Sequence, residues 1–251
     1  MKTLTYDHTH NLTLDIFFNT GTNTKNTCIY FLYGGRWSDG KKEDFRFVAY
    51  RFLKAGYHVA IADYRKFPQA KFPDFIHDAA NGLAAVHEQF EPSTRFVVMG
   101  HSSGAQIGAM LSLNPSYTQK AGGNVDMIDR FIGISGPYKF IDHIDQHDDL
   151  PQIFGPREDY HKSQPILLAE DITHKPPPML LIHGEKDTVT LPLNSTTLAK
   201  IVNEKHEGYG QAFILPDAKH VSTIGVFALP SWSTKSRMMM NAIDGFIARE
   251  F

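Results

Sequence analysis

Short, almost continuous apolar runs alternate along this chain with longer stretches in which apolar residues recur at helical spacing. The apolar runs are predicted strands over residues 12–18, 27–33, 57–62, 95–99, 128–134, 179–183 and 211–215. The amphipathic stretches are predicted helices over residues 44–54, 73–90, 105–113, 193–202 and 235–251. Helices between strands require crossover connections, and near-continuous apolar strands are typical of a sheet covered on both faces. We therefore expect an α/β fold with a mostly parallel central sheet flanked by helices on both faces.

The domain organisation follows from the length and from one interruption of this rhythm. A chain of 251 residues matches one α/β domain, so we expect a single domain over residues 1–251. Residues 136–178 break the alternation because they are rich in proline, with clustered acids and histidines. We predict that this segment is a short cap-like insertion that passes over one end of the sheet.

Composition excludes several classes of protein. The formal charge is 25 − 27 = −2 and no long basic run occurs, so we expect no nucleic-acid partner. The single cysteine, Cys28, excludes an intrachain disulfide and any multi-cysteine metal site. No stretch of about 18 apolar residues and no apolar leader is visible, so we expect a cytoplasmic protein without a membrane partner. These observations leave a small molecule as the expected partner and allow for a homodimer.

The pentapeptide Gly100-His101-Ser102-Ser103-Gly104 fits the pattern G-x-S-x-G. It follows a predicted strand and precedes a predicted helix rich in small residues, which is the setting of a nucleophile elbow. Glycines two residues before and after the serine allow the tight turn because neighbouring backbone comes close. We therefore expect Ser102 to be an exposed nucleophile.

A serine nucleophile needs a base and an orienting acid, which follow it in the order acid, then histidine, in this type of site. Asp187 comes shortly after the strand 179–183, and Glu185 is the competing acid. His220 follows the strand 211–215, whereas the competing His206 ends a polar helix. Sites in open α/β sheets gather at the carboxyl ends of strands, so we favour Asp187 and His220.

A glycine turn, Gly34-Gly35, follows the strand 27–33 and can aim successive N–H groups at one point. We expect an oxyanion hole made by the backbone N–H groups of Gly35, Arg36 and Ser103. Side chains that are candidates for lining the substrate pocket are Tyr33, Trp37 and His101.

One other cluster suggests a metal. Residues 142–149 contain His143 and His147 among carboxylates, and in a helix both imidazoles would share a face. We favour a solvated surface segment, because nothing in the sequence fixes that geometry. We expect no metal and no organic cofactor, and EDTA that leaves activity and melting temperature unchanged would remove the metal hypothesis.

These motifs resemble the α/β-hydrolase family, in particular the esterase branch with an oxyanion motif His/Tyr-Gly-Gly-x-Trp, which includes carboxylesterases and kynurenine formamidases. The matching segments are Tyr33 to Trp37, Ala62 to Arg65, Phe72-Pro73 with Asp78, Gly100 to Gly104, Ile134 to Tyr138, and His183 to Asp187. The resemblance implies a serine hydrolase with Ser102 as nucleophile, His220 as base and Asp187 as acid. Tyr33 stands where relatives usually carry His, and Arg36 where lipases carry Gly, so substrate preference does not carry over.

The resulting hypothesis is a serine carboxylesterase that hydrolyses small, short-acyl esters through an acyl-enzyme. The preference for small substrates rests on the compact length, which leaves only residues 136–178 as a cap. An aryl formamidase acting on N-formylkynurenine is the alternative within hydrolases, because the same three side chains cleave both bonds. From another class, the chain is a catalytically silent scaffold that serves as a binding protein.

Overall fold

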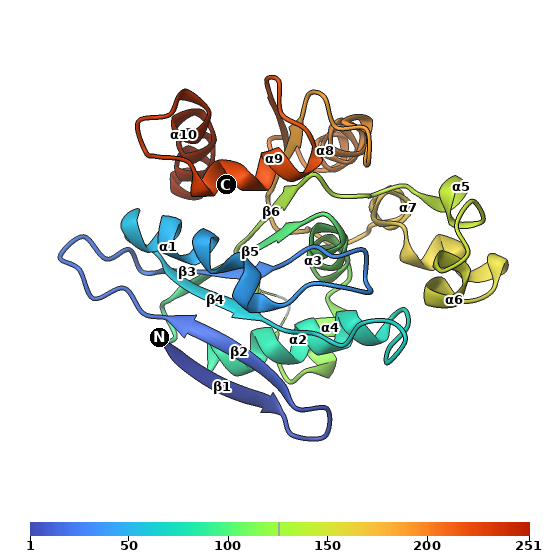
Figure 1. Ribbon diagram of the computed structural model, residues 1–251, viewed down its shortest axis with the longest axis horizontal. Coiled ribbons are helices and arrows are strands. Elements are labelled where there is room, and N and C mark those ends of the chain that lie inside the picture. The colour runs from blue at the N-terminus through green and yellow to red at the C-terminus, as the bar shows by residue number, and fades with distance from the viewer. Residues whose placement is uncertain (125) are drawn as a thin grey trace.

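The computed structural model describes residues 1–124 and 126–251, and within them eight strands form one sheet in the order β1-β2-β4-β3-β5-β6-β7-β8 (Figure 1). The strands are β1 Lys2–Asp7, β2 Leu12–Phe17, β3 Thr27–Leu32, β4 His58–Ala62, β5 Arg95–His101, β6 Arg130–Ile134, β7 Met179–Gly184 and β8 Gly210–Leu215. Neighbouring strands from β4 through β3 to β8 are parallel, and β2 pairs antiparallel with both β1 and β4. The expected mostly parallel sheet is confirmed.

The first strand was not among the predicted ranges. Residues 2–7 alternate polar and apolar side chains and are only half-buried, so they carry no apolar run. Their pairing with β2 makes the antiparallel edge hairpin at the border of the sheet (Figure 1). The alternation contains two apolar side chains, Leu4 and Tyr6, and a search for apolar runs misses such an edge strand.

The helices occupy most of the predicted positions, with shifted ends. The α-helices are α1 Arg46–Lys54, α2 Asp74–His87, α3 Ser103–Leu113, α4 Ser116–Lys120, α5 Ile141–Ile144, α6 Leu150–Phe154, α7 Pro165–Glu170, α8 Leu193–Lys205, α9 His220–Gly225 and α10 Thr234–Ala248. Three 3₁₀-helices are η1 Lys42–Phe45, η2 Arg157–Ser163 and η3 Val226–Ala228, among the described residues. The helix predicted over 73–90 ends at His87, and the terminal helix predicted to residue 251 ends at Ala248.

Packing against the sheet is dense on both faces. Every residue of β3, β6 and β7 is buried, as expected for strands covered from both sides. Helix α3 is buried along its whole length and packs on β5 and β6. Its small residues allow this approach, since a Cβ on Gly108 would lie 2.7 Å from the Phe131 ring. A rigid central helix therefore follows the proposed nucleophile.

Residues 136–178 contain the short helices α5, α6, η2 and α7. Figure 1 shows α5 and α6 standing at one end of the molecule, beyond the strands. The carboxyl ends of β3, β5, β7 and β8 share one edge of the sheet, because these strands are parallel. That edge carries the candidate site.

Candidate active site

Ser102 occupies a strained turn between β5 and α3. Its backbone has φ 52° and ψ −122°, and a positive φ is costly for a residue with a side chain. A Cβ on Gly100 would lie 2.2 Å from the Gly104 carbonyl oxygen, and one on Gly104 would lie 2.2 Å from the Leu32 carbonyl oxygen. Both glycines of the G-x-S-x-G pattern are therefore required by close backbone contacts.

The structure brings Ser102, His220 and Asp187 into one hydrogen-bonded chain. Ser102 Oγ lies 2.9 Å from His220 Nε2, and His220 Nδ1 lies 2.8 Å from Asp187 Oδ2. His220 is the first residue of α9 rather than part of a loop. The N–H of the preceding Lys219 donates to Ser222 Oγ at 2.7 Å, which fixes the start of that helix beside the strand ends.

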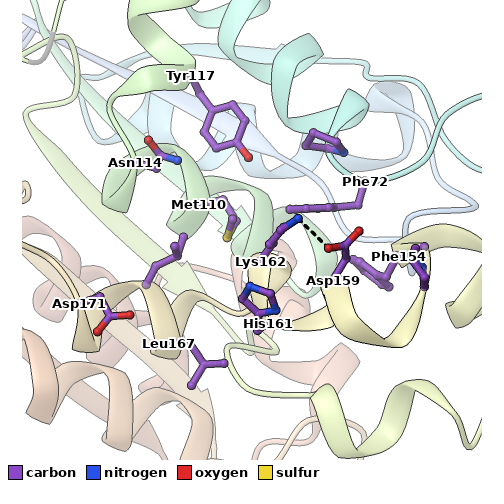
Figure 2. Close-up of a pocket in the computed structure, with 14 residues that line it drawn as sticks. Phe72, Met110, Asn114, Tyr117, Phe154, Asp159, His161, Lys162, Leu167 and Asp171 are labelled. Atoms are coloured by element: carbon purple, nitrogen blue, oxygen red, sulfur yellow. Dashed lines mark hydrogen bonds and ion pairs between the residues drawn. The ribbon is translucent and has the colours of Figure 1, made fainter.

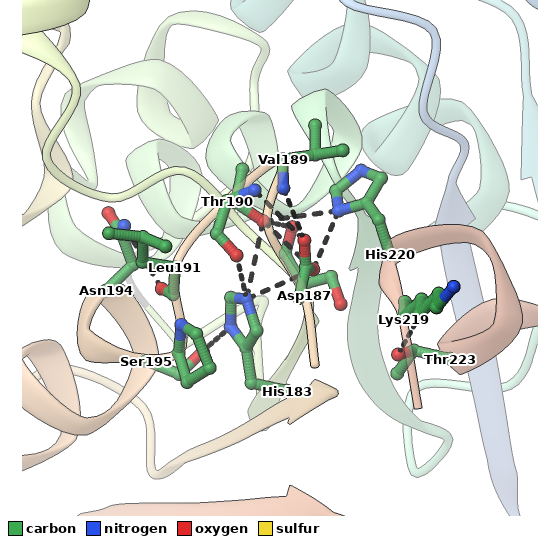
Figure 3. A network of polar contacts seen from close by, with 12 residues as sticks. His183, Asp187, Val189, Thr190, Leu191, Asn194, Ser195, Lys219, His220 and Thr223 are labelled. Carbon is green, nitrogen blue, oxygen red and sulfur yellow. Dashed lines mark hydrogen bonds and ion pairs between the residues drawn. The ribbon is translucent and has the colours of Figure 1, made fainter. Parts of the chain in front are cut away.

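Asp187 is buried and surrounded by donors (Figure 3). The N–H groups of Val189 and Thr190 donate to Asp187 Oδ1 at 2.9 and 3.0 Å. Burial alone would raise the pKa of Asp187, but hydrogen bonds from His183, His220 and the Thr190 backbone together hold this pKa well below its usual value. The carboxylate is therefore ionised wherever the protein is folded near neutral pH.

The turn after β3 has three consecutive residues with positive φ: Gly35 at 151°, Arg36 at 52° and Trp37 at 59°. Gly34 approaches the elbow so closely that a Cβ there would lie 2.9 Å from Ser102 Cβ. In the part of the chain that the structure describes, the N–H groups of Gly35, Arg36 and Ser103 have no hydrogen-bond acceptor. All three residues border the cavity around Ser102, so these donors are available to a ligand.

Buried side chains hold this turn from behind. The Tyr33 hydroxyl donates to Asp63 Oδ1 at 2.9 Å, and the Tyr64 hydroxyl donates to the Tyr33 carbonyl at 2.8 Å. Trp37 Nε1 donates to Gln106 Oε1 at 3.0 Å. Gln106 was not predicted, although a long polar side chain in an otherwise small and apolar helix could have indicated it.

A cavity of about 1140 Å³ surrounds Ser102 and His220. Of the three pocket candidates, Trp37 and His101 line this cavity and Tyr33 does not. His101 is buried beside His220, and burial, followed by the charge of a protonated His220, lowers the pKa of His101 to about 3. Its ring is therefore neutral in the site.

The competing candidates lie elsewhere. Glu185 accepts a hydrogen bond from the Asp217 N–H at 2.9 Å, and the His206 ring lies tilted against Tyr209 with the ring centroids 5.9 Å apart. The helix that a metal site required is also absent, because α5 ends at Ile144, before the second imidazole. Across residues 1–124 and 126–251, no group of three or more His, Cys, Asp or Glu side chains is arranged to hold a metal ion.

A second cavity of about 610 Å³ lies between the α3–α4 region and the η2–α7 part of the insertion (Figure 2). Phe72, Met110 and Phe154 form part of its wall, and Lys162 pairs with Asp159 at 2.6 Å on the insertion side. Ser102, His220 and Asp187 do not line this second cavity. The packing between the insertion and the body of the molecule is thus incomplete.

The sheet order, the elbow after β5 and the strand-end positions of the acid and the histidine define an α/β-hydrolase fold. The BD-FAE family model matches residues 14–202, and the chain belongs to the BD-FAE family. An esterase from Thermogutta terrifontis, Est2, has the same fold, with a TM-score of 0.76, 19% sequence identity, and coverage of 98% of this chain and 91% of that one.

The names of related proteins include the esterases and kynurenine formamidases that the motifs resemble. A probable isoprenylcysteine α-carbonyl methylesterase from Oryza sativa subsp. japonica is 27% identical over 212 residues, which cover 76% of this chain and 51% of the relative. A kynurenine formamidase from Salmo salar is 26% identical over 106 residues, 42% of this chain and 36% of that protein. The chain thus spans about half the length of the first relative. Among the described residues, none of the helices combines the length and hydropathy that a membrane crossing needs.

Proposed function

We propose that the protein is a serine hydrolase that cleaves carboxylic esters, with Ser102 as nucleophile, His220 as base and Asp187 as acid. The observation that carries this proposal is the chain of two hydrogen bonds, 2.9 and 2.8 Å long, that ends at Ser102 Oγ. Each side chain in it has the partner that its role requires. The names of the related esterases support the same reaction class.

In the first half-reaction His220 Nε2 takes the Ser102 proton while Oγ attacks the ester carbonyl carbon. The carbonyl π pair moves to oxygen and gives a tetrahedral oxyanion. As this intermediate collapses, the bond from carbon to the leaving oxygen breaks, and protonated His220 donates its proton to the departing alcohol. Asp187, held ionised by its donors, fixes the imidazole orientation and stabilises its charged form. An acyl-enzyme on Ser102 remains.

In the second half-reaction water replaces the alcohol. His220 takes a proton from water, the hydroxide oxygen attacks the acyl carbon, and the bond to Ser102 Oγ breaks as the proton returns to the serine. The N–H groups of Gly35, Arg36 and Ser103 are the donors that we assign to the oxyanion in both steps. Each such donor is worth about 2.7–4 kcal/mol of barrier.

The cavity suggests the class of ester. Its mouth carries exposed aliphatic side chains, with exposed fractions of 72% for Val189, 54% for Leu191 and 74% for Val221. We propose uncharged esters on this ground, and a short acyl group because the compact chain leaves only residues 136–178 as a cap. Since the cavity holds more than a short acyl group, the decisive panel varies the acyl chain and the leaving group independently, with Ser102→Ala as control. A sharp preference for long acyl chains would contradict this part of the proposal.

Formamide hydrolysis is the second candidate, favoured by the related kynurenine formamidase. The same nucleophile and base can open an N-formyl amide, so the geometry does not separate the two reactions. Purified protein is assayed in parallel with p-nitrophenyl acetate and N-formylkynurenine. We expect the larger kcat/KM with the ester, and a larger value with N-formylkynurenine would replace the esterase proposal.

A catalytically silent binding protein is the remaining alternative. It predicts a folded protein that hydrolyses no member of the ester panel, whereas the hydrogen-bonded serine supports catalysis.

We further propose that residues 1–251 form one domain with residues 136–178 as a cap over the cavity, supported by Lys139, Phe140 and Leu150 in the cavity wall. The homodimer and the cytoplasmic location stay predictions.

A further inference from the structure

A second histidine, His183, contacts the carboxylate of Asp187 from the side opposite His220 (Figure 3). Its Nε2 lies 3.2 Å from Asp187 Oδ2 and 2.7 Å from the Thr190 carbonyl oxygen. His183 is fully buried at the end of β7 and does not line the cavity around Ser102. It therefore cannot act on a substrate directly.

The partners of His183 define how its ring is held. A carbonyl oxygen only accepts, so Nε2 carries a proton and donates it toward Thr190 and Asp187. Nδ1 lies 2.8 Å from Ser195 Oγ, whose hydroxyl can donate to it. Both ring nitrogens are satisfied in an interior where an unpaired polar group is costly, so the orientation of the ring is fixed.

The bond to Thr190 closes the loop around the acid. The N–H of Thr190 donates to Asp187 Oδ1 at 3.0 Å, while its carbonyl accepts from His183. The Thr190 hydroxyl also donates to the Ser135 carbonyl at 3.0 Å, which joins this loop to the end of β6. His183 thus anchors the segment that presents its backbone donors to Asp187.

We infer that His183 is a positioning residue for Asp187 and that Ser195 holds His183 in the required orientation. The inference rests on the proposed function, because it concerns the acid of that site. The chain of contacts then runs from Ser195 through His183 to Asp187, and from there through His220 to Ser102. A reacting group displaced by about 1 Å can cost 100-fold in rate, which is the scale on which such an anchor acts.

The test compares His183→Leu with His183→Gln, in which the amide keeps a donor near the Nε2 position. Rates with p-nitrophenyl acetate are divided by the active sites titrated with a fluorophosphonate, so unfolded protein does not count. We expect His183→Leu to lower kcat by about 10- to 100-fold with KM little changed, because the residue lies outside the cavity. His183→Gln should recover most of this loss.

Ser195→Ala keeps the inference testable if His183→Leu does not fold. We expect it to lower kcat by about 2- to 10-fold, the factor that corresponds to one net hydrogen bond. Its matched control is Ser112→Ala, which removes another buried hydroxyl, bonded to the Gly108 carbonyl at 2.8 Å on α3. That control should lower the melting temperature and leave kcat unchanged.

Three results would overturn the inference while wild-type protein is active and Ser102→Ala is not. The first is an unchanged kcat per titrated site in His183→Leu, or in Ser195→Ala if His183→Leu does not fold. The second is a rise in KM that accounts for the whole loss of activity. The third is a His183→Gln variant that is no more active than His183→Leu. Wild-type protein without esterase activity, or Ser102→Ala as active as wild type, would instead refute the proposed function, and the inference with it.

Discussion

Two segments border the cavity around Ser102, and they are held in different ways. The acid loop, residues 187–195, is held by the buried His183 and Ser195 behind Asp187. Near its end the side-chain oxygen Oδ1 of Asn194 accepts from the N–H groups of Tyr138 and Lys139 at 2.8 and 2.7 Å. The front of the insertion, residues 141–163, packs through buried side chains such as Ile153 and Phe154, but its ion pairs are exposed. These pairs are Arg36–Asp149, Arg157–Asp145 and Lys162–Asp159.

The difference follows from what each contact is worth. An exposed ion pair contributes about 0–1 kcal/mol, whereas breaking a buried hydrogen bond costs about 1–3 kcal/mol. The contacts around the acid are therefore costly to remove, whereas the ion pairs of the insertion can be changed at little cost in stability. We propose that the reaction depends on the first segment and that substrate shape depends on the second.

The largest effect is expected at Ser102, the proposed nucleophile, which lies in the cavity that both segments border. Ser102→Ala should lower kcat for p-nitrophenyl acetate by about 10⁶-fold, because the nucleophile of such a unit accounts for most of its catalysis. Steady-state assays with Ser112→Ala as the buried-serine control measure this. Activity close to wild type in the Ser102→Ala variant would mean that Ser102 is not the nucleophile and that neither segment supports catalysis by it.

The next effect isolates the rigid segment. Asp187→Asn should lower kcat by about 10⁴-fold, because an amide lacks the negative charge and its NH2 group, donating to His220 Nδ1, favours the wrong imidazole tautomer. Glu185→Gln is the matched control, two residues away, and should change kcat by less than about twofold, as expected for an exposed site. Equal losses in both variants would mean that the acid has been assigned to the wrong carboxylate.

A smaller effect is expected for the stability of the fold in acid, through the buried His101 beside His220. The folded pKa of His101 is about 3, below the usual 6.5, so below pH 6.5 the unfolded chain binds a proton that the folded chain does not. Stability from this residue is full above pH 6.5 and falls as the pH drops toward 3, by about 2 kcal/mol at pH 5. Urea unfolding at pH 7.5 and 5 should show a pH-dependent loss that is about 2 kcal/mol smaller in His101→Gln. An identical pH dependence in both proteins would place His101 in contact with solvent.

The smallest effect belongs to the adjustable segment. Asp149→Asn removes the partner of Arg36 at 2.8 Å, and both side chains are more than a third exposed. We expect a stability change below about 1 kcal/mol, an unchanged kcat and a KM within about threefold of wild type. Thermal unfolding and ester kinetics check this together, and a tenfold lower kcat would break the contrast between the two segments.

Sequence reasoning reached the parts of the site that depend on strand ends. Ser102, Asp187 and His220 each follow an apolar strand, and parallel strands bring their carboxyl ends together, so their proximity was predictable. The contacts behind them were not. His183 and Gln106 act through partners that are distant in sequence or on other elements, and a single chain carries no periodic signal for such pairs. The edge strand β1 was missed for a similar reason, because its position depends on pairing with β2.

The central claim is that Ser102 is activated by the His220–Asp187 chain, and covalent labelling tests it most directly. Folded protein is treated with a fluorophosphonate, and the modified residue is located by mass spectrometry of its peptides. The account predicts one adduct per chain, on Ser102, that disappears in Ser102→Ala and after unfolding of the wild type. A folded protein that takes up no label, or that carries it on another residue, would contradict the account.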